Sequence, residues 1–98
     1  MLDVTGLGPK MKEASQLMQM LATPVRLQLL CNLLDGEKSV QALVKALGMS
    51  QPVVSHHLKL LREAGLVKTR REAQTIYNSL NGHEVEAVLN TLHDLYCS

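Results

Sequence analysis

The sequence contains no Phe or Trp and only two Tyr among its 98 residues, although 46% of them are hydrophobic. A core without large aromatic rings must be built from Leu, Val, Ala and Met, a mixture that favours packed helices. No hydrophobic run exceeds three residues, which excludes a transmembrane helix and the apolar segment of a signal peptide. We therefore expect one cytoplasmic domain that makes no contact with a membrane.

Cysteine is also scarce: the sequence contains two, Cys31 and Cys97. They are too few and too far apart for a disulfide scaffold or a CxxC-type zinc site, and such thiols normally stay reduced in the cytosol. A role for them would therefore be a chemical one.

The net charge is only +1, but the charges are unevenly distributed along the chain. Residues 38–71 contain a single acid, Glu63, whereas residues 81–98 contain three acids and no Lys or Arg. This separation predicts one surface that meets a polyanion, with an ordinary solvated face as the alternative. The basic residues of the first segment are Lys38, Lys45, Lys59, Arg62, Lys68, Arg70 and Arg71.

Hydrophobic spacing predicts a mainly helical domain at residues 10–98, preceded by a loose tail at residues 1–9. Two β-prone runs, at residues 66–71 and 75–80, predict a hairpin. We expect five helices, at residues 10–21, 24–34, 40–47, 51–64 and 83–96.

The third and fourth helices are joined by a very short turn, which predicts a helix-turn-helix with the hairpin as its wing. The second helix of this motif lies in the major groove of DNA, with its exposed N-terminal positions at the base edges. Gln pairs with adenine, Ser and His serve bases or phosphates, and Lys and Arg neutralise the backbone. The predicted contacts to double-stranded DNA are Gln51, Pro52, Ser55, His56, Lys59 and Arg62 from the helix, and Lys68, Arg70, Arg71 and Gln74 from the wing.

His57 is expected to have a structural role. It lies beside Leu58 and close to Leu61, so we expect it to form a hydrogen bond inside the junction between this helix and the wing. His56 is the better candidate for reading a base.

The segments ATPVRLQLL and SQPVVSHHLKLLREAGLVKTRREAQTIYNSL, with the closing helix, resemble the ArsR/SmtB family of bacterial winged-helix repressors over about residues 12–97. The resemblance implies a homodimer formed by the first and last helices, which leaves the promoter when an inducer binds. An apolar stripe of Val88, Leu89, Leu92 and Tyr96 on the last helix agrees with a dimer, although core packing within one chain is the alternative.

The inducers of this family are mostly metal ions. The family's cysteine-rich site has no counterpart here, because the third helix reads SVQALVKALG and contains no thiol. The four positions that match its last-helix site hold Asn81, His83, Asp94 and Cys97, so a carboxylate and a second His are missing. His93 and Cys97 are spaced like half of a metal site, which keeps metal sensing through His83, His93, Asp94 and Cys97 open as an alternative.

RLQLLC and LHDLYC resemble the two-cysteine branch of the family, the HlyU-, BigR- and SqrR-like repressors. The resemblance implies that Cys31 and Cys97 sense reactive sulfur species or oxidants by forming a bridge, and that the bridged protein releases its operator. Two inert cysteines are the alternative, with Cys31 a small hydrophobe on the apolar face of its helix. The distance between the two would decide between a disulfide and a longer polysulfide bridge.

Two other classes of function are less well supported. An enzyme with Cys97 as nucleophile and His93 as base would need an oxyanion or substrate-binding motif, and none is present. A winged helix that binds only proteins would leave the basic wing without a purpose. We therefore expect neither an enzyme nor a cofactor.

Overall fold

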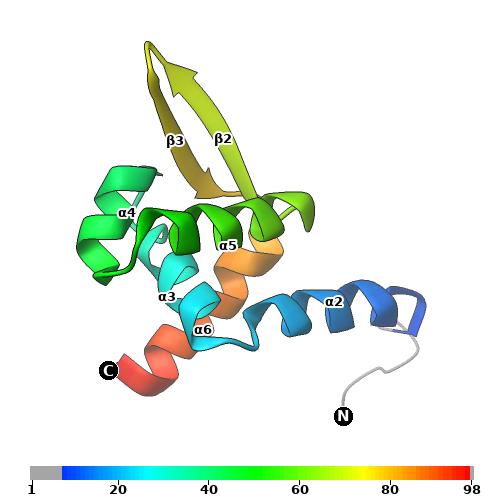
Figure 1. Ribbon diagram of the computed structural model, residues 1–98. Helices are drawn as coiled ribbons and strands as arrows, with labels where there is room; N and C mark the ends of the chain where they lie inside the picture. The colour runs from blue at the N-terminus through cyan, green and yellow to red at the C-terminus, as the bar shows by residue number, and fades with distance from the viewer. Residues whose placement is uncertain (1–7, 98) are drawn as a thin grey trace.

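The computed structural model describes residues 8–97, and over this range it confirms a winged helix-turn-helix with five α-helices (Figure 1). Residues 1–7 of the expected tail lie outside the described residues, while Gly8 and Pro9 begin a short 3-10 turn. The elements in chain order are η1 (Gly8–Lys10), α2 (Met11–Leu21), α3 (Pro24–Asn32), β1 (Lys38–Ser39), α4 (Val40–Leu47), α5 (Gln51–Glu63), β2 (Val67–Glu72), β3 (Thr75–Leu80) and α6 (His83–Cys97).

Hydroxyl caps determine where the central helices begin. The side chain of Thr23 caps α3, and Ser39 Oγ accepts a hydrogen bond of 3.1 Å from the Ala42 amide at the start of α4. Gly48 ends α4 in the left-handed conformation, with φ +66°, and two residues later Ser50 caps α5. This short connection makes α4 and α5 the predicted helix-turn-helix.

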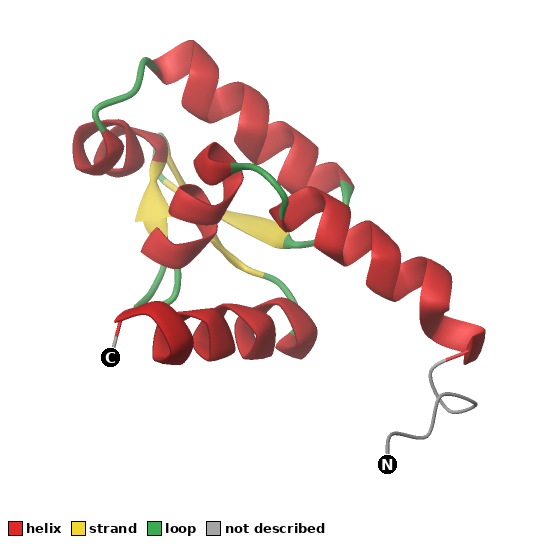
Figure 2. Ribbon diagram, turned by 90° about the horizontal axis from the view of Figure 1, so that it is seen from below, coloured by secondary structure: helices red, strands yellow, loops and turns green. Residues whose placement is uncertain are grey.

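The core consists of aliphatic side chains, as the missing aromatics required. Each of α3, α4, α5 and α6 contributes fully buried residues, and β2 contributes one at its first position. The buried set is Leu21, Leu29, Leu30, Leu33, Leu43, Val54, Leu58, Leu61, Val67, Val85 and Leu89. In Figures 1 and 2, α2 extends beyond the other helices at one end of the molecule. None of the described helices is long and apolar enough to cross a membrane.

The sheet contains a strand that the sequence analysis did not predict. β1 pairs antiparallel with β3, placing Lys38 opposite Asn78 and Ser39 opposite Tyr77, so the strand order is β1-β3-β2. The side chain of Asn78 is buried, and its Nδ2 donates a hydrogen bond of 3.3 Å to the Lys38 carbonyl oxygen. The wing is therefore joined at its base to the segment that leads into α4.

Candidate DNA-binding surface and cysteine pair

The α5 helix presents one face to the core and the other to solvent. Val54, Leu58 and Leu61 are buried, and the helical repeat turns the predicted DNA-contacting residues outward. All six are exposed, namely Gln51, Pro52, Ser55, His56, Lys59 and Arg62. The structure thus brings them together on one accessible helix, and their contact with DNA remains a prediction.

The same helix exposes an apolar residue that the sequence analysis did not single out. Val53 is 41% exposed in the first turn of α5, while its neighbour Val54 is buried. Two adjacent valines look equivalent in sequence, and only the helical phase set by Leu58 and Leu61 separates them. An exposed apolar side chain in the first turn of α5 is suited to contact with the methyl group of thymine.

The wing projects away from the helices (Figure 1). Its predicted DNA contacts, Lys68, Arg70, Arg71 and Gln74, are all exposed. Side chains alternate along β2, so Lys68 and Arg70 share one face and Arg71 lies on the other, with Val67. Among the described residues, Lys68 and Arg71 form no ion pair.

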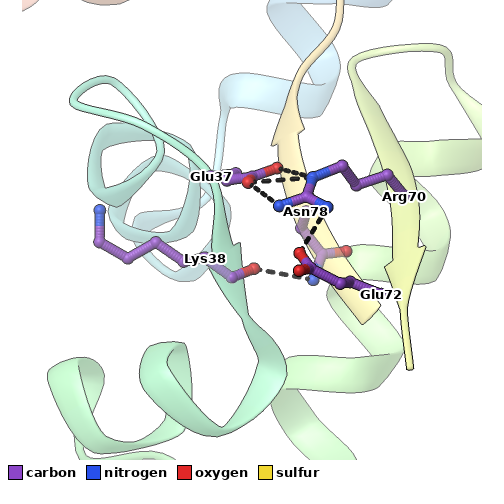
Figure 3. A network of polar contacts seen from close by, with 5 residues as sticks. All are labelled: Glu37, Lys38, Arg70, Glu72 and Asn78. Carbon is purple, nitrogen blue, oxygen red and sulfur yellow. Dashed lines mark hydrogen bonds and ion pairs between the residues drawn. The ribbon is translucent and has the colours of Figure 1, made fainter. Parts of the chain in front are cut away.

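Arg70 is held by two carboxylates (Figure 3). Its Nε and Nη2 both donate to the carboxylate of Glu37, with Nε 2.8 Å from Oε2, and its Nη1 donates to Glu72 Oε2 at 2.9 Å. The guanidinium also lies over the Tyr77 ring, 4.7 Å from its centroid. Hydrogen bonding from Arg70 lowers the pKa of Glu37, so this carboxylate is ionised at neutral pH. The guanidinium that was predicted to meet phosphate is thus already engaged in the free protein.

His57 differs from its expected role. Its Nδ1 atom is buried and has no hydrogen-bond partner within the described part of the chain, so this atom does not make the hydrogen bond that was expected of His57 inside the junction. Burial lowers the pKa of His57, and the charges of His56 and Arg26 lower it further. Arg26 in turn donates from Nε to the Met20 carbonyl oxygen at 2.7 Å, at the C-terminal end of α2.

The two cysteines are free thiols at the surface. Cys31 is exposed, so its expected place as a small hydrophobe on an apolar helix face is wrong, and Cys97 is exposed at the end of α6. Partial burial of the thiol raises the pKa of Cys31, and the charge of Cys97 raises it further. The two thiols lie on α3 and α6, helices whose buried residues belong to the same hydrophobic core.

The alternative metal ligands are not gathered in one place. Within residues 8–97 of a single chain, no three His, Cys, Asp or Glu side chains lie close enough to hold a metal ion. His83 begins α6 and Cys97 ends it, and the ten residues from His83 to His93 correspond to a rise of about 15 Å along a helix.

Large apolar side chains remain exposed on the first and last helices. Met11 and Met18 on α2 are about half exposed, while Leu95 and Tyr96 on α6 are 69% and 82% exposed. The predicted stripe on α6 is divided, because Leu89 belongs to the core of the single chain. The outer part of the stripe is therefore available to a partner.

An exposed helix at the second position of a helix-turn-helix, flanked by a basic wing, defines a winged helix-turn-helix DNA-binding protein. Residues 23–69 match the family described as bacterial regulatory protein, arsR family. The transcriptional activator HlyU of Vibrio cholerae is 48% identical over 87% of this chain and 79% of its own length. The biofilm growth-associated repressor of Xylella fastidiosa is 38% identical over 88% of this chain and 75% of its own. The chain therefore belongs to the ArsR family and is a transcriptional regulator.

Solved structures agree with this assignment. HlyU of Vibrio cholerae superposes with a TM-score of 0.88 at 46% identity, covering 91% of this chain and 97% of its own. The repressor BigR of Xylella fastidiosa superposes with a TM-score of 0.91 at 34% identity, covering 99% of each chain. A homodimeric winged helix-turn-helix DNA-binding domain from Mycobacterium bovis superposes with a TM-score of 0.80 at 30% identity, covering 90% of this chain and 82% of its own.

Proposed function

We propose that the chain acts in the cytoplasm as a homodimeric repressor whose operator affinity falls when Cys31 and Cys97 of one protomer become bridged. The observations that support this proposal are that both thiols are exposed and that α3 and α6, which carry them, pack into one hydrophobic core, with the raised pKa of Cys31 in agreement. The relatives include a protein named as an activator and one named as a repressor, and the proposed step, release of DNA, is the same for either.

The proposed DNA contacts divide by chemistry. Gln51, Val53, Ser55 and His56 face the base edges, because they lie in the first two turns of α5. Charged and polar groups nearby meet the phosphates, which position the protein without reading sequence. This second set is Lys59, Arg62, Lys68, Arg71 and Gln74, whereas the apolar Pro52 lies with the base-facing residues in the first turn of α5.

The proposed dimer forms through α2 and α6. Their exposed Met18, Leu95 and Tyr96 are apolar surface that a second copy would cover. A two-fold dimer also presents two α5 helices to successive major grooves of a palindromic duplex, one helical turn or about 34 Å apart.

The raised pKa of the Cys31 thiol bears on the order of reaction. Cys31 is the poorer nucleophile at neutral pH because its pKa is raised, so we propose that Cys97 attacks first. When Cys97 has formed a bond to another sulfur, it is no longer negatively charged. Its contribution to the raised pKa of Cys31 then disappears, and Cys31 ionises more easily to complete the bridge.

Two inducer chemistries balance in atoms and electrons. Hydrogen peroxide takes two electrons from the two thiols, producing a disulfide and two molecules of water. With an organic trisulfide, Cys97 attacks the central sulfur and displaces one thiolate, and Cys31 attacks the same sulfur and displaces the second. The product is a bridge with one additional sulfur atom between the cysteines.

A bridge would affect DNA binding through helix packing. α3 contacts α5, so tying α3 to the end of α6 links the DNA-reading helix to the proposed dimer helix. A small rotation of each subunit changes the separation of the two α5 helices, which must match the DNA repeat. A loss of about 1.4 kcal/mol in binding free energy lowers affinity tenfold.

The test compares reduced protein with protein treated with an organic trisulfide, hydrogen peroxide or zinc chloride. The DNA probe is a duplex that reduced protein selects from a random-sequence library. We expect release after the trisulfide or peroxide, with an internal sulfur link in the intact mass, and neither effect in Cys31→Ser or Cys97→Ser. Both variants should bind DNA normally when reduced. If the trisulfide or peroxide still releases both variants from DNA, the cysteine switch is contradicted. Release from DNA by zinc alone would favour the alternative of metal sensing through His83, His93, Asp94 and Cys97.

A further inference from the structure

Arg70 and Glu37 form a link across all three strands of the sheet. Arg70 is on β2, and it reaches Glu37, which immediately precedes β1 (Figure 3). On the way its guanidinium crosses the ring of Tyr77 on β3. Glu37 is 33 residues before Arg70 in the chain, so this contact joins the wing to the segment between α3 and α4.

Beyond the contacts at its base, little else holds the orientation of the wing. In β2 only Val67 is buried, and the remaining five residues are exposed. β1 pairs with β3 only at Asn78 and Tyr77, so beyond this point the hairpin is a two-stranded ribbon. An isolated two-stranded hairpin is marginally stable in water.

The segment that contains Glu37 is well anchored on the other side. Lys38 Nζ donates to the Asn32 carbonyl oxygen at 2.7 Å and pairs with Asp35, which ties this segment to the C-terminal end of α3. Ser39 caps α4, the first helix of the helix-turn-helix. Glu37 therefore offers the wing a point of attachment that is fixed relative to the DNA-reading unit.

We propose that Glu37 is a positioning residue for DNA binding. Its carboxylate binds the Arg70 guanidinium and so holds the wing at a fixed angle to α5. The inference rests on the proposed contact between the wing and DNA, and it changes the role of Arg70 from phosphate contact to attachment point. Glu37 and Glu72 offset the charge of Arg70, so this cluster adds no net attraction for phosphate. Lys68 and Arg71, which pair with no carboxylate among residues 8–97, are left to meet the DNA backbone.

A phosphate contact by Arg70 makes the opposite predictions. If DNA displaces Glu37 from the guanidinium, then neutralising Glu37 frees Arg70 and tightens binding. If Glu37 holds the wing in place, neutralising it weakens binding. The sign of the effect of Glu37→Gln therefore separates the two roles, and the salt dependence of affinity gives a second criterion because it counts phosphate contacts.

The experiment measures affinity for the library-selected duplex over a series of salt concentrations, using reduced protein. We expect Glu37→Gln and Arg70→Gln each to weaken binding about threefold to tenfold with an unchanged salt slope, and the double variant to be no weaker than either. Exchanging the two charges, with Glu37→Arg and Arg70→Glu together, should restore part of the loss. Arg71→Gln is the matched control on the same strand, and should lower the salt slope by about one.

A measurement without DNA makes the test independent of the proposed function. Backbone ¹⁵N relaxation should show less order at residues 72–76 in Glu37→Gln than in wild type, with helix amides unchanged. Unchanged or tighter DNA binding by Glu37→Gln, a lower salt slope in Arg70→Gln, or unchanged order at the wing tip would each overturn the inference. If wild type binds no duplex, the proposed function fails, and the relaxation result alone decides whether Glu37 holds the wing.

Discussion

Arg26 on α3 and His57 on α5 are electrostatically opposed: burial is the main cause that lowers the pKa of the His57 imidazole, and the charges of His56 and then of Arg26 lower it further. Arg26 also donates hydrogen bonds to the carbonyl oxygens of Met20 and Gln19 at the end of α2. The junction of α2, α3 and α5 thus contains a cation beside a histidine whose Nδ1 has no partner in the described residues. Protonation of His57 would place a second positive charge at this junction.

The first prediction concerns the pH dependence of stability. The pKa of His57 is lowered by folding, so the unfolded chain binds its proton more readily, and the free energy of unfolding should fall as pH decreases from about 7.5 toward 5. Each unit of pKa difference corresponds to about 1.4 kcal/mol. Urea unfolding across this range should show the decrease in wild type and a weaker one in His57→Gln. His83→Gln, at an exposed histidine, is the control, and an equal decrease in His57→Gln would show that another group is responsible.

The second prediction concerns base reading by α5. Gln51→Ala should cost about 1–3 kcal/mol on the preferred duplex and much less on random DNA, because Gln contacts bases and its loss relaxes sequence preference. Lys59→Gln is the comparison, and should weaken both duplexes similarly and reduce the salt slope. Competition binding with the two DNAs measures the ratio, and an unchanged ratio in Gln51→Ala would remove this residue from base recognition.

The third prediction concerns the dimer. Leu95 is 69% exposed in the single chain, so Leu95→Glu should leave the fold intact while placing a charge in the proposed interface. Sedimentation should show monomers and DNA affinity should fall. Leu92→Glu should act in the same direction, although Leu92 is partly covered already. Asn90→Glu, at an exposed position of the same helix, should remain dimeric, and dimers in Leu95→Glu would place the interface elsewhere.

The fourth prediction concerns the buried amide of the sheet. Asn78→Ala removes the hydrogen bond to the Lys38 carbonyl oxygen and leaves that acceptor without its partner, which should lower the free energy of unfolding by about 1–3 kcal/mol. Urea denaturation measures the change. Asn90→Ala, at a solvent-exposed amide, should change stability by less than about 0.5 kcal/mol, and an equally small effect at Asn78 would mean that β1 contributes little.

The sequence was sufficient to predict the helix order, the helix-turn-helix and the β2–β3 hairpin. These features depend on local signals, such as the hydroxyl caps at Ser39 and Ser50, the left-handed glycine at position 48 and the spacing of apolar residues. Exposure of Gln51, Ser55 and His56 followed from the same helical periodicity. Local patterns of this kind are legible without knowledge of the tertiary fold.

The features that were missed depend on contacts between distant segments. β1 is two residues long and exists only because β3 lies beside it, so it is too short to show the alternating pattern that predicts a strand. Glu37 is 33 residues from Arg70, and its capture of the guanidinium depends on the register of three strands. Cys31 lies in an apolar stretch of sequence, yet the packing of α3 leaves it at the surface.

Ser39 belongs to two structures at once, because it is the last residue of β1 and the N-cap of α4. Deleting or inserting one residue here would shift the strand pairing by one position, or else remove the cap. A wing transplanted from another regulator as a β2–β3 unit alone would therefore lack its partner strand and its carboxylate anchor. An exchange of wings among such regulators would need to carry residues 37–39 together with residues 67–80.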